Sequence, residues 1–166
     1  MTTGDGENNL RAKPDWNKLI PALAGYFTPG PADPEDYAFC ESGIEAALGF
    51  SNLFWPNFYV FEELVFRGDD PQPDELAAAN IENWLNHYDG DKSKVVAMLN
   101  HEHLIDLFRL RHKPGDDQQI TYLATVIVDM WAAKLRQDFP SRCFEVELDR
   151  TGSETWDWEI TFYQRR

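Results

Sequence analysis

The chain has 166 residues, of which 43% are hydrophobic and 14% aromatic. That composition is enough to bury the core of one ordinary domain. The chain carries 29 acidic and 15 basic residues, a net charge of −14. A surface of that sign repels phosphate backbones and anionic lipids, and no apolar run reaches the roughly 20 residues that cross a bilayer. We expect neither direct nucleic-acid binding nor a membrane protein.

The N-terminal residues are polar and include glycine, so we expect a flexible tail over residues 1–12 and a single globular domain over residues 13–166. The start of the chain has no apolar stretch typical of a secretory leader. Cys40 and Cys143 lie far apart and in no metal or redox spacing. We therefore expect unpaired thiols and a reducing, cytoplasmic location.

The first predicted elements are helical. A short helix begins near Asp15 and is interrupted by Pro21. Asp33 and Pro34 are typical of an N-cap and a first helical turn, so a second helix should run through about Leu48 and end at Gly49. The following aromatic stretch is divided by a proline. Its second half, residues 58–66, satisfies both strand and helix patterns, and its β propensity favours a strand.

Three helices are predicted next. Pro73 opens the first, which continues to Tyr88 and is stopped by Gly90. Asp91 is placed to cap the second, from Lys92 to about Arg111, with a break at Asn100 as an alternative. The third and longest runs from Asp116 and Asp117 to about Asp138. It is apolar except for a narrow stripe (Thr121, Thr125 and Asp129), which predicts a helix in the middle of the core.

The C-terminal residues alternate between apolar and polar, which predicts an antiparallel β-hairpin. The apolar positions are Phe144, Val146 and Leu148 and, after a glycine-containing turn, Trp156, Trp158, Ile160 and Phe162. An isolated hairpin is marginally stable, so this face should lie on the helices, and a third strand near residues 59–66 would help. The fold class is therefore α+β: a mostly α-helical single domain with a C-terminal antiparallel hairpin.

The stretch LNHEHLIDLF contains two of the four histidines, His101 and His103. Successive helical residues are rotated by about 100°, so on a helix these two side chains point about 200° apart. They converge only if the helix breaks at Asn100 and the pair lies in an extended turn. A metal or acid/base site would consist of His87, His101, His103 and Asp106. Helix packing and capping are the commoner roles of such residues, and we expect no bound metal.

The polar face of the predicted hairpin is acidic. If the tryptophans point inward, five carboxylates point outward: Glu145, Glu147, Asp149, Asp157 and Glu159. Like charges on neighbouring strands oppose folding. This face either protects the sheet edge from aggregation or forms the surface that binds a basic partner.

The chain contains no phosphate-binding loop, dinucleotide fingerprint, nucleophile elbow or H-E-x-x-H motif. These absences favour a binding protein over an enzyme, and we expect no cofactor. The preferred hypothesis is a small acidic cytosolic binding or inhibitory protein that engages a basic protein partner. Immunity proteins and nucleic-acid mimics offer an analogy of charge and size. The alternative is a small enzyme or metal-binding protein that uses the histidine-rich segment 87–112.

Overall fold

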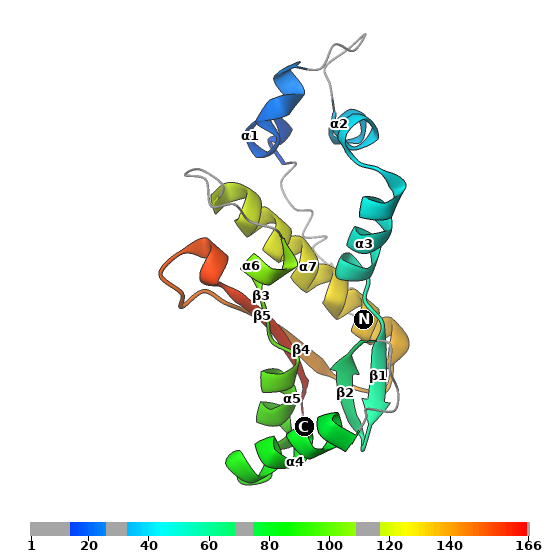
Figure 1. The fold of residues 1–166 in the computed structure, drawn as a ribbon, viewed down its shortest axis with the longest axis vertical. Helices are drawn as coiled ribbons and strands as arrows, with labels where there is room; N and C mark the ends of the chain where they lie inside the picture. The colour runs from blue at the N-terminus through cyan, green and yellow to red at the C-terminus, as the bar shows by residue number, and fades with distance from the viewer. Residues whose placement is uncertain (1–13, 26–32, 69–74, 109–116, 166) are drawn as a thin grey trace, which may run out of the picture. The chain divides into compact units, whose positions relative to one another are not determined.

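The computed structural model describes residues 14–25, 33–68, 75–108 and 117–165. By its internal contacts the chain divides into two compact units, Met1–Gly43 and Ile44–Arg166. The predicted tail over residues 1–12 lies outside the described residues, and the single domain over residues 13–166 stays a prediction. The elements can be followed in Figure 1.

The first unit contains α1 (Trp16–Leu19), the 3-10 helix η1 (Pro21–Gly25) and α2 (Pro34–Glu41). The predicted short helix near Asp15 is α1, and the Asp15 side chain caps it by accepting a hydrogen bond from the Lys18 N–H. Asp33 caps α2 through the N–H groups of Glu35 and Asp36. The caps are local features, which explains why the sequence predicts them well.

The predicted helix through Leu48 is wrong at its C-terminal end. α2 ends at Glu41, and a new helix, α3 (Ile44–Phe54), begins after Ser42 and Gly43. Serine and glycine are both poor formers of helix interiors, which is consistent with the break. Gly49 lies inside α3 rather than at its end.

Residues 58–67 form a hairpin of their own. β1 (Phe58–Phe61) pairs antiparallel with β2 (Leu64–Arg67). Glu62 and Glu63 make the turn with φ values of 47° and 69°, the left-handed conformation that two-residue hairpin turns require. The strand prediction for this segment is confirmed, but the hairpin forms a separate two-stranded sheet.

The helices α4 (Glu75–His87) and α5 (Lys92–Leu99) cover this hairpin. Gly90 has a φ of 79°, and its N–H donates to the Leu85 carbonyl, which ends α4. Asp91 caps α5 through the N–H groups of Ser93 and Lys94. One hydrophobic cluster of the second unit lies between this hairpin and the two helices, and it is built from Leu64, Phe66, Ile81, Val95 and Val96.

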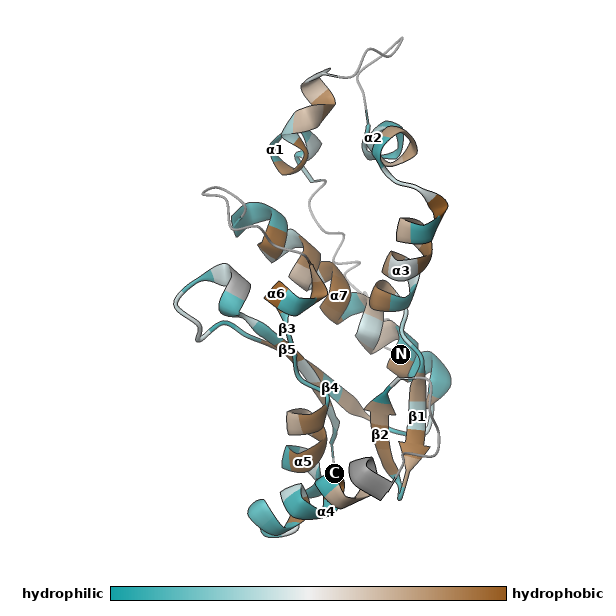
Figure 2. Cartoon of the chain, in the orientation of Figure 1, coloured by the Kyte–Doolittle hydropathy of each residue, from teal (hydrophilic) through white to brown (hydrophobic). Residues whose placement is uncertain are grey.

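The longest helix, α7 (Asp117–Asp138), lies in the main core, as its apolar pattern predicts. Its buried residues pack with two residues of the C-terminal sheet, forming a cluster that contains Ile120, Ala124, Ile127, Trp131, Leu135, Ile160 and Phe162. Figure 2 shows mostly hydrophobic residues along β2 and a mixture of hydrophobic and hydrophilic residues along α7. Among the described residues, no helix combines the length and hydropathy that a membrane crossing requires.

The C-terminal sheet has three strands in the order β3-β5-β4, and it establishes the α+β class. β4 (Phe144–Asp149) and β5 (Glu159–Gln164) form the predicted hairpin, and β3 (Glu102–His103) pairs with β5 (Figure 1). The third strand therefore comes from the histidine segment and not from residues 59–66. A short helix, α6 (Leu104–Leu107), follows β3.

The C-terminal hairpin is shorter on one side than its sequence alternation predicts. The 3-10 helix η2 (Thr155–Asp157) precedes β5, so Trp156 and Asp157 lie outside the ladder. Ile160 and Phe162 face α7 in the core. On the opposite face, Thr161 donates to the Ala97 carbonyl of α5 at 2.5 Å. Helices therefore cover parts of both faces of the sheet.

Candidate functional site

The acidic side chains of β4 lie on the face of the sheet opposite α7. Register places Glu145 across from Tyr163, Glu147 across from Thr161, and Asp149 across from Glu159. Since side chains alternate along a strand, all six share one face. Four of the five carboxylates predicted to face outward are thus brought together. Asp157 is not among them, because it lies in η2, where it accepts a hydrogen bond from Ser153.

Neighbouring groups partly compensate these four carboxylates. Glu145 forms an ion pair with Arg165. Asp149 accepts a hydrogen bond from the Thr151 N–H at 2.8 Å. Glu159 lies 3.3 Å from His103 Nδ1. The fourth compensation is the Tyr163 hydroxyl, which donates to Glu147 at 2.5 Å.

The Tyr163 hydroxyl titrates abnormally because of this environment. Its hydrogen bond to Glu147, its burial and the negative charge of that carboxylate together raise the pKa of Tyr163 above 10.0. Ionised Tyr163 would lose the hydrogen bond and place two negative charges side by side. The protonated Tyr163 hydroxyl therefore stabilises the Glu147 carboxylate on the acidic face.

The two histidines reach the same face because α5 ends at Asn100. The buried Asn100 side chain donates to the Val65 carbonyl and accepts from the Arg67 N–H, both at 3.0 Å. The chain then becomes extended, so His101 and His103 point to one side and their ring centroids lie 5.3 Å apart. The prediction that they diverge on a helix is wrong, and the alternative of a break at Asn100 is confirmed.

The hydrogen bonds of the two histidines constrain their proton positions. His101 Nδ1 contacts the Met98 carbonyl, which only accepts hydrogen bonds, so Nδ1 carries a proton. In neutral His101 the second ring nitrogen, Nε2, is then an acceptor. His103 directs Nδ1 at the Glu159 carboxylate. A histidine oriented by a carboxylate is an arrangement that can transfer protons.

The other two residues of the predicted histidine site lie elsewhere. His87 ends α4, where its ring packs against Trp84 and Tyr88 at centroid distances of 5.4 and 4.8 Å. Asp106 is exposed in the first turn of α6. Within the described ranges, no three or more histidine, cysteine, aspartate or glutamate side chains are grouped so that they could hold a metal ion.

A groove of about 730 Å³ joins the acidic face to the histidine segment. Three carboxylates line it, from Glu147, Asp149 and Glu159, with Lys94 as the one ammonium group among its lining residues. Lys94 itself lies 3.9 Å from Asp91. The remaining lining residues are Tyr88, Ala97, Met98, His101, Leu148 and Thr161. Because two candidate sites from distant parts of the sequence meet here, we take this groove as the candidate functional site.

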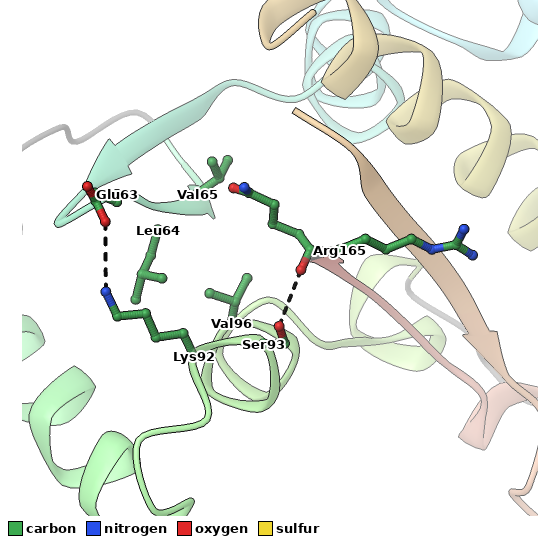
Figure 3. Close-up of a pocket in the computed structure, with 8 residues that line it drawn as sticks. Glu63, Leu64, Val65, Lys92, Ser93, Val96 and Arg165 are labelled. Carbon is green, nitrogen blue, oxygen red and sulfur yellow. Dashed lines mark hydrogen bonds and ion pairs between the residues drawn. The ribbon is translucent and has the colours of Figure 1, made fainter. Parts of the chain in front are cut away.

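A smaller hollow of about 150 Å³ lies between β2, α5 and the end of β5. Figure 3 shows Leu64 and Val96 inside it, with the Glu63–Lys92 ion pair of 3.9 Å at its rim. The Arg165 side chain extends away from the hollow (Figure 3) and pairs with Glu145. Its small volume makes this hollow the weaker candidate.

Sequence reasoning did not anticipate the wall of the groove that α5 contributes. Lys94, Met98 and Tyr88 belong to a helix and its preceding turn, and only the packing of α5 on β5 places them beside the acidic strands. No local pattern signals such a contact. Comparisons of the chain with protein-family models, with curated proteins and with solved structures found no match.

Proposed function

We propose that this protein is a binding protein whose groove holds a basic segment of a protein partner. The observation that carries the proposal is the charge of the lining, three carboxylates against one ammonium group. Complementary charge speeds association and selects partners. A small inhibitor of a basic enzyme or toxin is one form that this function would take, by analogy of charge and size alone.

The arrangement of the carboxylates supports binding of a cationic group. Asp149 and Glu159 are direct neighbours across the β4–β5 ladder, and a pair of like charges in this position is destabilising by roughly 0.2–1 kcal/mol. His103 compensates Glu159 when its imidazole is protonated. A lysine or arginine of the partner, placed between Asp149 and Glu159, would relieve the repulsion at neutral pH without requiring a protonated His103.

The test uses a fluorescent hexalysine peptide as the probe. The double variant Glu147→Gln, Glu159→Gln should bind it roughly two- to thirtyfold more weakly at low salt, since each of the two surface ion pairs contributes ~0.2–1 kcal/mol. The matched control is Glu45→Gln, Glu82→Gln, which removes the same charge from exposed positions on α3 and α4. An equal loss in both variants would mean that the peptide senses net charge only, and the groove would no longer be the proposed site.

A second candidate function is proton transfer by the histidine pair. It is supported by the 3.3 Å approach of His103 to Glu159 and by the proximity of the His101 ring. The substrate would be a small molecule that enters the groove. Screening hydrolysable ester substrates against the wild type and His103→Gln tests it: activity that persists unchanged in His103→Gln would exclude this residue as the acid or base.

A further inference from the structure

β4 is an edge strand of the C-terminal sheet. It pairs with β5 on one side, and no strand in the described part of the chain pairs with it on the other. Its six residues carry the acidic face on one side and half-buried apolar residues on the other. An edge of this kind presents backbone donors and acceptors that can pair with another chain.

The register determines which backbone groups of β4 point to the open edge. The Arg165 N–H donates to the Cys143 carbonyl at 2.8 Å, so Phe144 and Gln164 form a non-hydrogen-bonded pair in the antiparallel ladder. Pairs alternate along the strands. The acidic residues of β4 therefore direct their N–H and C=O groups at β5. The backbone groups that point to the open edge belong to Phe144, Val146 and Leu148.

From this alternation we infer that the bound segment is an extended strand that pairs with the open edge of β4. The inference rests on the proposed function and specifies the partner further. The strand would pair antiparallel to β4, so its residues opposite Glu145, Glu147 and Asp149 would form non-hydrogen-bonded pairs, in which side chains approach most closely. Those residues would be basic, because they lie beside carboxylates.

The other face of the added strand has a different requirement. Phe144, Val146 and Leu148 are half-buried and pack against the main core cluster. Residues opposite them would extend this apolar surface, so they would be apolar. The partner segment therefore alternates basic and apolar residues over about six positions, the length of β4.

Synthetic peptides test the alternation directly. The first probe is a capped heptapeptide of alternating lysine and valine with lysine at both ends. The second has the same composition in two blocks, lysines followed by valines. The alternating peptide should bind at least about tenfold more tightly at the same salt concentration, because only it can satisfy the β4 edge and the acidic face together.

Backbone methylation separates strand pairing from charge. In the alternating peptide, the valine N–H groups would face β4 and the lysine N–H groups would face away. N-methylation of the valines should abolish the tenfold advantage, whereas N-methylation of the lysines, the matched control, should retain most of it. The protein provides a second measurement by NMR. Peptide binding should slow amide exchange at Phe144, Val146 and Leu148, while Glu147, already bonded to β5, changes little.

The possible results distinguish the two proposals. Equal affinity for the alternating and block peptides, without slowed exchange at Val146, would overturn strand addition and leave the charged groove intact. If neither peptide binds at low salt, both the inference and the proposed function fail. Tight binding of the alternating peptide, weakened by the Glu147→Gln, Glu159→Gln variant and by methylated valines, would support both.

Discussion

The Asn100 side chain is bound to the Arg67 backbone: its Oδ1 accepts the Arg67 N–H at 3.0 Å, while its Nδ2 donates to the Val65 carbonyl. The Asn100 amide thus makes the two hydrogen bonds to β2 that a neighbouring strand would make with its backbone. Asn100 is also the buried polar residue at which α5 ends. This contact joins the small hairpin to the histidine segment and determines the direction in which the chain continues.

Replacing Asn100 with alanine should destabilise the fold by about 2 kcal/mol or more, because two backbone groups lose their partner, at roughly 1–3 kcal/mol for each unsatisfied buried group. Urea unfolding monitored by circular dichroism measures the loss. Asn86→Ala, at an exposed position on α4, is the control and should be close to neutral. If Asn100→Ala unfolds at the same urea concentration as wild type, the Asn100 side chain does not stabilise the contact between the β1–β2 hairpin and the histidine segment.

The Tyr163–Glu147 hydrogen bond should make stability depend on alkaline pH. That hydrogen bond raises the pKa of Tyr163 in the folded state above the ordinary value of 10.0. The stabilisation it contributes is therefore fully present below pH 10.0 and is lost as the pH rises through the folded-state pKa. Tyr163→Phe should flatten this alkaline loss, measured as the urea midpoint against pH. Tyr88→Phe serves as the control, and an identical alkaline slope in wild type and Tyr163→Phe would contradict the prediction.

Trp131 should be the tryptophan most sensitive to substitution. It is fully buried, its Nε1 donates to the Leu53 carbonyl at 3.0 Å, and Arg67 lies over its ring at 5.0 Å. Trp131→Phe removes the donor and leaves a cavity, so we expect a loss of about 2–4 kcal/mol. Thermal unfolding compares it with Trp55→Phe, whose residue is 38% exposed. Similar melting temperatures for the two variants would show that Trp131 does not hold α3 to α7.

The two thiols should react freely in the native protein. Cys40 and Cys143 are both unpaired and exposed, so a chromogenic disulfide reagent should titrate two equivalents without denaturant. Cys40→Ser and Cys143→Ser should each lower the count by one. Non-reducing mass spectrometry that finds the two residues linked would refute this, along with the expectation of a reducing compartment.

Local chemistry explains what the sequence determined by itself. The caps at Asp33 and Asp91, the long apolar helix ending at Asp138 and the alternation that begins at Phe144 all depend on neighbouring residues in the chain. Helix and strand periods are visible in such short windows. The α+β class follows from them, as does the gathering of acidic residues on one face of the hairpin.

Tertiary contacts decided the rest. The third strand, the convergence of His101 with His103 and the α5 wall of the groove all follow from the buried bonds of Asn100 to β2 and the bond of Thr161 to Ala97. Asn100 lies more than 30 residues from its partners in the sequence. The asparagine amide has a carbonyl acceptor and two N–H donors, so it can cap a helix, accept a hydrogen bond in a turn or bond the backbone of a strand. Which of these it does depends on which buried backbone groups the folded chain brings to it.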